Sequence, residues 1–248
     1  MHEDPASGDT ARLSVPELAR MIDLSAVTAA HNEADVRRLA QLAREKQCVA
    51  AFALPGLTPL LGELLEGEPA IALGGVVGFP SGGTLTAHKA IEARELARLG
   101  CRELDMVINI GWLRSGWEAQ VRDDIRAVVE AAEGRPVKVI LECHYLSEDE
   151  IRRGCALCVE AGASFVKTGT GWAPTGATAA NIALMKACVG DACQVKAAGG
   201  VRTLETLVEL HRLGATRFGI GVDSAIRIFE QCAALPGGVV NSAGHTRG

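Results

Sequence analysis

Eight short apolar or β-branched runs alternate with amphipathic segments along the chain, and this alternation restricts the possible folds more than any other feature of the sequence. Between the runs, segments such as 87–99, 117–132, 148–161 and 204–213 carry apolar residues near the helical period. Repeated strand–helix units of this kind predict an α/β protein with a parallel sheet. The eight runs that we interpret as strands cover residues 21–24, 49–53, 71–77, 103–108, 137–142, 165–167, 194–198 and 217–221.

Eight such units can close into a (β/α)8 or TIM barrel, and the 248 residues of the chain are near the usual size of that fold. An open doubly wound sheet is the alternative, but its first strand–helix turn should carry a Gly-rich dinucleotide fingerprint, and residues 24–33 contain no Gly. We therefore predict a single barrel domain over residues 1–248, with residues 1–12 and 237–248 as loose termini.

The composition argues against several classes of protein. The net charge is −5 and no basic run interrupts the sequence, so we expect no nucleic-acid partner. The first twelve residues lack the apolar core of a signal peptide, and no window approaches about 18 continuous apolar residues, so we expect a cytoplasmic protein without a membrane span. The eight cysteines lie mostly in apolar stretches, as reduced and buried thiols do. Cys155 and Cys158 form a CxxC inside a predicted helix, where core packing is a better interpretation than metal binding.

The six lysines are few beside nineteen arginines, so each position is informative. Lys138 opens its strand, at the barrel end associated with stability, whereas Lys167 and Lys196 lie near the carboxyl ends of theirs, where barrel enzymes place their chemistry. An ammonium group at the end of an apolar strand is costly to desolvate, so it is either paired with a carboxylate or has a functional role. The other three fall on predicted helices, where we expect surface charges: Lys46, Lys89 and Lys186.

Two lysines on neighbouring strands favour a catalytic interpretation, because one ammonium group depresses the pKa of the other and frees an amine to attack a carbonyl. Asp105 stands among apolar neighbours at the end of another strand, and a carboxylate there can shuttle protons during Schiff-base formation. A structural ion pair is the alternative for each lysine. Glu142, at the end of its strand, is a further candidate to pair with a lysine, while we expect His144 and His211 to be structural.

Glycine pairs follow two of the last three predicted strands and end the third. They lie at 169 and 171, at 199 and 200, and at 219 and 221. The loops after strands seven and eight are the usual phosphate-binding corner of a barrel, where backbone amides donate to the anion. The pairs therefore predict a phosphorylated small-molecule substrate.

In six segments the sequence resembles the deoxyribose-phosphate aldolase family, and the likeness extends over nearly the whole chain. The segments are IDLS at 22–25, VVGFP at 76–80, ELDMVIN at 103–109, VKVILE at 137–142, FVKTGTG at 165–171 and VKAAGGVRT at 195–203. By this resemblance Lys167 matches the Schiff-base lysine, Lys196 the second lysine that lowers its pKa, and Asp105 the proton-relay aspartate. The residues expected to bind substrate and phosphate are Ser25, Thr170, Gly171, Gly199, Gly200, Gly221 and Ser224.

The resemblance implies a class I aldolase that reversibly cleaves 2-deoxy-D-ribose 5-phosphate to acetaldehyde and D-glyceraldehyde 3-phosphate, with no metal or organic cofactor and as a homodimer. Several positions depart from the family pattern, among them Phe52, Gly169, Trp172 and Asp223. They leave open a related lysine-dependent aldolase or thiolase-like enzyme that acts on another phosphorylated sugar. A barrel that binds a sugar phosphate without catalysis is a further alternative, and borohydride trapping with acetaldehyde separates it from an aldolase.

Overall fold

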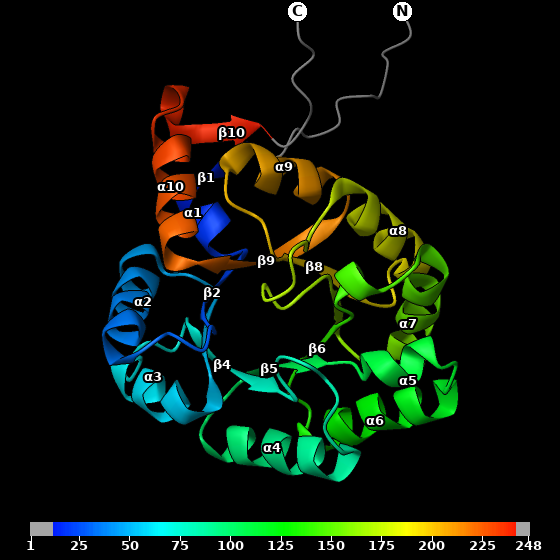
Figure 1. Ribbon diagram of the computed structural model, residues 1–248. Coiled ribbons are helices and arrows are strands. Elements are labelled where there is room, and N and C mark those ends of the chain that lie inside the picture. The colour runs from blue at the N-terminus through cyan, green and yellow to red at the C-terminus, as the bar shows by residue number, and fades with distance from the viewer. Residues whose placement is uncertain (1–11, 242–248) are drawn as a thin grey trace, which may run out of the picture.

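The computed structural model describes residues 12–241, and its centre is a closed barrel of eight parallel strands (Figure 1). Each strand pairs with the next along the chain, and β9 pairs back with β2, which closes the ring. All eight strands fall on the predicted runs, so the (β/α)8 fold is confirmed and the open sheet is excluded. The strands are β2 (Ile22–Ala26), β3 (Ala50–Ala53), β4 (Ala72–Val77), β5 (Glu103–Val107), β6 (Val137–Ile140), β7 (Phe165–Lys167), β8 (Gln194–Ala198) and β9 (Ala215–Gly221).

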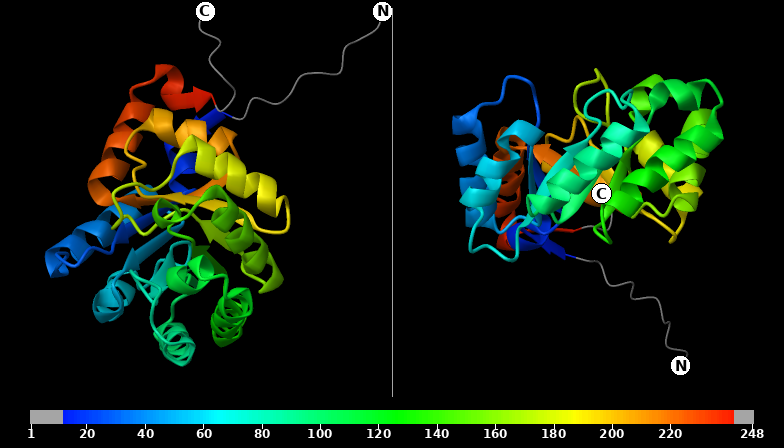
Figure 2. Two further views of the ribbon diagram at one scale, coloured as in Figure 1. Left: turned by 45° about the vertical axis from the view of Figure 1, so that its right-hand side comes forward. Right: turned by 90° about the horizontal axis from the view of Figure 1, so that it is seen from below.

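Within residues 12–241, the eight longest α-helices surround the strands, as can be followed in Figures 1 and 2. They are α2 (Glu33–Lys46), α3 (Thr58–Leu64), α4 (Thr86–Arg98), α6 (Glu118–Ala131), α7 (Glu148–Glu160), α8 (Ala179–Val189), α9 (Leu204–Arg212) and α10 (Val222–Ala233). Shorter pieces complete the chain: α1 (Val15–Ala19), α5 (Ile110–Arg114), η1 (Pro55–Leu57), η2 (Cys143–Tyr145) and η3 (Pro236–Gly238). Each strand therefore leads into a helix that packs on the outside of the barrel.

A second, two-stranded sheet joins the two ends of the described chain. Strand β1 (Arg12–Ser14) pairs antiparallel with β10 (Val239–Asn241), beside α10 and α9 in Figure 1. The prediction of loose termini is therefore wrong for Arg12 and for residues 239–241, because backbone pairing joins these distant segments, and residues 237 and 238 belong to the short 3-10 helix η3 before β10. The remainder of that prediction concerns residues 1–11 and 242–248, which lie outside the described residues.

Alternation along the strands divides the buried side chains into two sets, because successive residues of a strand point to opposite faces. The outward set, which includes Leu24, Val139 and Phe218, packs with the helices in one continuous hydrophobic core. The inward set includes a small apolar cluster on β3 and β4: Ala50, Phe52, Ala72 and Val76. Charged side chains of β2, β5, β6, β7, β8 and β9 pair with one another in the barrel interior, and that division places the chemistry inside the ring.

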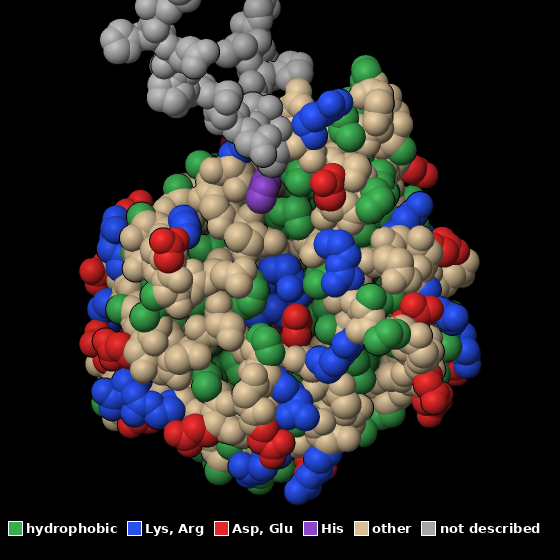
Figure 3. Space-filling model, turned by 180° about the vertical axis from the view of Figure 1, so that it is seen from behind, with side chains coloured by type: hydrophobic (Ala, Val, Ile, Leu, Met, Phe, Trp, Pro, Cys, Tyr) green, Lys and Arg blue, Asp and Glu red, His purple; other side chains and the backbone are tan. Residues whose placement is uncertain are grey.

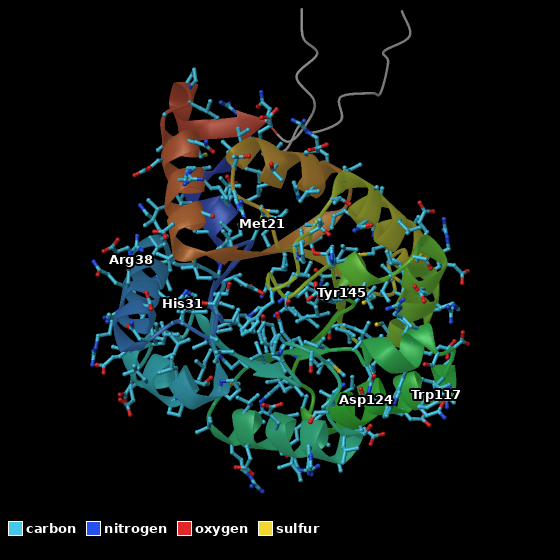
Figure 4. All side chains as sticks on the ribbon, in the orientation of Figure 1. Met21, His31, Arg38, Trp117, Asp124 and Tyr145 are labelled. Atoms are coloured by element: carbon cyan, nitrogen blue, oxygen red, sulfur yellow. The ribbon has the colours of Figure 1, made fainter. Side chains whose placement is uncertain are left out.

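Lys89, predicted to be a surface charge, is fully buried between α4 and α6. Its Nζ donates to Asp124 Oδ2 at 2.6 Å and to the carbonyl oxygen of Val107, the last residue of β5, at 3.0 Å. Figure 4 places Asp124 on α6, facing α4. On the same helix, Glu92 accepts a hydrogen bond from the backbone N–H of Gly78 at 2.7 Å. Two residues of α4 thus fix the carboxyl ends of β4 and β5, and the surface prediction for Lys89 is wrong.

Removing the Lys89 charge is expected to destabilise the fold. A Lys89→Met substitution leaves Asp124 buried without its cation and should lower the free energy of unfolding by about 3–5 kcal/mol, measured by urea denaturation. The double variant Lys89→Met/Asp124→Leu removes both charges and should recover most of that loss. A single variant as stable as the wild type would show that the pair contributes nothing to the fold.

On the face shown in Figure 3, basic and acidic side chains are interspersed over the surface. Several of the charged side chains form ion pairs within one helix, such as Arg37 with Glu33 and Arg98 with Glu95. Among residues 12–241, no helix combines the length and the apolar character that a membrane span requires.

Candidate active site

A pocket with a volume of about 200 Å³ opens at the carboxyl ends of the barrel strands. Its wall contains all ten residues that the sequence predicted for catalysis or binding. Three come from inside the barrel: Asp105, Lys167 and Lys196. Seven surround them on the strand ends and the following loops: Ser25, Thr170, Gly171, Gly199, Gly200, Gly221 and Ser224. The closed barrel brings these residues together because parallel strands end at the same rim.

Asp105 on β5 connects the two candidate lysines. Its Oδ2 accepts from Lys167 Nζ at 2.8 Å and from Lys196 Nζ at 2.6 Å. Asp105 and Lys196 are each 1% exposed and Lys167 is 7% exposed, so only the outermost of the three has measurable access to solvent. The arrangement places one amine at the floor of the pocket, with a carboxylate and a second amine directly beneath it.

Four further charged residues extend this cluster toward the other end of the barrel, and sequence reasoning missed them as members of the site. Lys138 Nζ lies 3.1 Å from Asp105 Oδ1 and 2.6 Å from Glu103 Oε2. Asp23 lies 2.6 Å from Lys196 Nζ through Oδ2 and 2.8 Å from Arg217 through Oδ1. Asp23 had a signal that could have identified it, since it stands between Ile22 and Leu24 as a lone acid in an apolar strand.

Burial and charge act in opposite directions on the ionisable groups of this cluster. Burial raises the pKa of Asp105, but Lys138, Lys167 and Lys196 outweigh burial and hold that pKa well below its ordinary value. Burial lowers the pKa of Lys196, and because Asp105 and Asp23 only partly oppose this, the pKa falls to about 8. Burial also disfavours the charge on Lys138, yet its three carboxylate neighbours raise the pKa of Lys138 above the ordinary value. Asp105 is therefore ionised near neutral pH, and Lys196 can gain or lose a proton in that region.

Phe52, one of the departures from the family pattern, forms the apolar side of the catalytic floor. The centre of its ring lies 4.6 Å from Lys196 Nζ and 4.7 Å from Lys138 Nζ, at cation–π distance. Gly74 on the neighbouring strand makes room for the ring, since a Cβ there would come within 2.3 Å of it. A phenylalanine in this position restricts the side of the pocket next to Lys196 and Lys138 and holds both ammonium groups against an aromatic face.

Glu142 does not pair with a lysine as predicted. It is buried and accepts from the backbone N–H and the hydroxyl group of Thr170. A Cβ on Gly169 would come within 2.7 Å of Glu142 Oε1, so a serine at 169 would require this bound carboxylate to move. The glycine at this departure is thus explained by Glu142, and the hydroxyl of Thr170 serves mainly to shape the loop.

Trp172, a third departure, lies in the loop between β7 and α8, which crosses in front of the barrel opening in Figure 1. Its indole Nε1 donates to the carbonyl oxygen of Val27 at 2.8 Å, 145 residues away in the sequence. The ring of Trp172 also meets that of Phe79 edge to face, with 6.1 Å between centroids. The tryptophan therefore ties the β7–α8 loop to the loop after β2 and bounds the mouth of the pocket.

Asp223, the fourth departure, points away from the pocket. Its side chain is 77% exposed and forms an ion pair with Arg38 at 2.7 Å. Gly221 precedes α10 without any side-chain cap, so the first backbone amides of that helix are available to an anion. Arg202 also lines the pocket, and within residues 12–241 its guanidinium group has no partner. The rim on this side thus offers donors to a phosphate, as the glycine pattern predicted, and sequence reasoning missed Arg202.

The cysteines and histidines that the sequence analysis considered have structural surroundings. Cys155 and Cys158 are buried in α7, and burial raises the pKa of both thiols, which confirms their interpretation as core residues. His211 Nδ1 lies 2.9 Å from the carbonyl oxygen of Ala215. His144, for which the sequence showed no partner, has one in Thr175 Oγ1 at 2.7 Å. Within residues 12–241 no three His, Cys, Asp or Glu side chains gather to hold a metal ion.

The described groups can perform one kind of chemistry together. A lysine amine at the floor of a small pocket can add to a carbonyl, and the adjacent carboxylate and second amine can move the protons that imine formation requires. This fold and site define a lysine-dependent barrel enzyme for small carbonyl compounds.

Comparison with known proteins agrees with that class. Residues 19–231 match the DeoC/LacD family aldolase, and the chain belongs to this family. It is 50% identical over 234 residues to a deoxyribose-phosphate aldolase of Sinorhizobium medicae, covering 94% of each chain. It is 45% identical over 220 residues to one of Klebsiella pneumoniae, covering 88% of each. A solved deoxyribose phosphate aldolase of Aeropyrum pernix, described as tetrameric, superposes with a TM-score of 0.81 at 28% identity, covering 89% of this chain and 93% of that one.

Proposed function

We propose that this chain is a class I aldolase that reversibly cleaves 2-deoxy-D-ribose 5-phosphate to acetaldehyde and D-glyceraldehyde 3-phosphate. The observation that carries the proposal is the placement of Lys167 Nζ 2.8 Å from Asp105 Oδ2, at the floor of a pocket whose rim offers donors to a phosphate. The relatives named as deoxyribose-phosphate aldolases support the choice of substrate.

In the cleavage direction, the neutral amine of Lys167 adds to the C1 carbonyl of the open-chain sugar, and loss of water gives an iminium ion. Removal of the proton from the C3 hydroxyl group breaks the C2–C3 bond, and its electron pair passes to the iminium nitrogen to form an enamine. Glyceraldehyde 3-phosphate leaves at this step. Protonation of the enamine at C2 and addition of water release acetaldehyde and restore Lys167. We assign the proton transfers to Asp105 and Lys196, because one carboxylate oxygen of Asp105 accepts hydrogen bonds from both Lys196 and the reacting amine of Lys167.

The test is cleavage of 2-deoxyribose 5-phosphate by the purified protein, with glyceraldehyde 3-phosphate formation coupled to NADH oxidation. We expect steady turnover without added metal, and borohydride with acetaldehyde should attach one reduced ethyl group to the protein. Trapping without turnover would retain the lysine chemistry but refute this substrate. The assay would then turn to other phosphorylated sugars that fit beside Phe52 and Trp172. If the protein shows neither turnover nor trapping, only the alternative of a sugar-phosphate-binding barrel without catalysis remains.

The rate of cleavage is expected to fall as the pH rises through about 8. Lys196 has a pKa of about 8 and is charged below that pH, where its ammonium group can donate a proton to the reacting groups. Above it the charge is lost, so kcat/KM should decrease there. In a Lys196→Met variant, kcat/KM should be about 10²–10⁴-fold lower and show no fall near pH 8. A fall that persists in this variant would assign the titration to another group.

The homodimer and the cytoplasmic location expected from the sequence remain proposals. Sedimentation velocity at several protein concentrations would decide the first, because a dimer and a tetramer of a 248-residue chain differ clearly in sedimentation coefficient. A tetramer would match the assembly described for the Aeropyrum pernix protein.

A further inference from the structure

His31 lies on the loop between β2 and α2, at the edge of the catalytic pocket. Its side chain also lines an adjoining recess with a volume of about 190 Å³, which shares Ser25, Gly221 and Ser224 with the pocket. In Figure 4, His31 and Arg38 are both on the α2 side of the barrel. The histidine therefore stands where the pocket widens toward the first turn of α10, on the side of the amides that can receive an anion.

One hydrogen bond fixes the ring of His31 and a second fixes the turn that carries it. The backbone N–H of Thr28 donates to Nδ1 at 3.1 Å, and the backbone N–H of His31 donates to the carbonyl oxygen of Thr28 at 3.1 Å. Because Nδ1 accepts a hydrogen bond, the neutral ring carries its own proton on Nε2. Among residues 12–241, Nε2 has no partner. The loop thus presents one N–H donor whose tautomer is set by the backbone.

The charges around His31 favour an anion in this place. Asp35 is occupied as an acceptor from the backbone N–H of Asn32 at 2.9 Å, and Asp223 is paired with Arg38. On the pocket wall, the Arg202 guanidinium adds positive charge. The nearby acids are therefore engaged with other groups, while the donors toward the pocket are open.

We propose that His31 is a specificity-determining residue that donates a hydrogen bond from Nε2 to the phosphate group of the substrate. This inference rests on the proposed function and deepens it, because it assigns a side chain to the selection of a phosphorylated over an unphosphorylated sugar. In the described structure His31 has no hydrogen bond or ion pair with Lys167, Lys196 or Asp105, so its effect falls on binding and not on the bond-breaking step.

The experiment compares His31→Leu, which removes the donor, with His31→Gln, whose side-chain Nε2 can reach the same position. His88→Leu is the matched control, because His88 is exposed on α4 and does not line the pocket. KM and kcat are measured for 2-deoxyribose 5-phosphate and for 2-deoxyribose. Calorimetry measures the binding of inorganic phosphate to the same proteins without any need for catalysis.

We expect His31→Leu to raise KM for the phosphorylated sugar about 10- to 100-fold, as loss of a hydrogen bond to a charged group predicts. The preference for the phosphorylated sugar, taken as a ratio of kcat/KM values, should fall by a similar factor, and phosphate binding should weaken. His31→Gln should recover most of the preference. An equal loss on both sugars, or unchanged phosphate binding, would overturn the inference. A wild type that binds phosphate through His31 but cleaves no deoxyribose 5-phosphate would refute the proposed function alone.

Discussion

Replacing Lys167 by methionine is expected to reduce cleavage of 2-deoxyribose 5-phosphate on the order of 10⁴-fold or more, as loss of a covalent nucleophile does. Methionine keeps an unbranched side chain of similar length but has no amine to form an imine. Asp105 retains Lys196 and Lys138 as partners in this variant, so its carboxylate stays compensated and the fold should persist. Both the cleavage activity and the increase in protein mass after trapping with acetaldehyde and borohydride should be lost.

The matched control for this prediction is Lys46→Met on α2, which removes a half-buried lysine that does not line the pocket. It should keep both the rate and the trapped adduct, and peptide mapping of the wild type should place that adduct on Lys167. An adduct that forms equally well in the Lys167→Met protein would show that another amine is the nucleophile, with Lys196 as the nearest candidate.

Replacing Asp105 by asparagine should give the second largest effect, a decrease in kcat of about 10²–10⁴-fold, the usual contribution of a general acid–base group. The substitution keeps the shape of the side chain but removes the negative charge that Lys138, Lys167 and Lys196 share. Asp105 raises the pKa of Lys196, so its loss should lower that pKa further below 8. The residual activity should therefore begin to fall at a lower pH than in the wild type, as a pH–rate profile would show.

Glu103, which is partly buried, provides the control for the loss of a carboxylate inside the barrel. It lies two residues before Asp105 on β5 and contacts Lys138 and Arg217, but neither Lys167 nor Lys196. Glu103→Gln should lower the unfolding midpoint much as Asp105→Asn does, with a far smaller loss of kcat. Equal losses of kcat in both variants would mean that Asp105 acts only through stability, and proton transfer would then belong to Lys196 alone.

Local patterns were sufficient for the strands and for the three candidate catalytic residues. A run of a few apolar or β-branched residues is enough to predict each strand. Because side chains alternate with a period of two, the run also indicates which of them face inward. Because parallel strands of a barrel end at one rim, position along a strand was enough to select Lys167, Lys196 and Asp105. The same reasoning failed for Lys138, whose position at the start of a strand concealed its 3.1 Å contact with Asp105 inside the barrel.

The sequence by itself therefore determined the eight strands, their inward faces and the positions of the lysine pair on them, since these depend on neighbours within a few positions. Only the tertiary structure decided which distant groups meet. Lys89 finds Asp124 across 35 residues, Trp172 reaches Val27 across 145, and Arg12 pairs with Asn241 at the far end of the chain. The physical reason is that a hydrogen bond or an ion pair depends on distance in space, and the closure of the barrel and the packing of its helices set that distance.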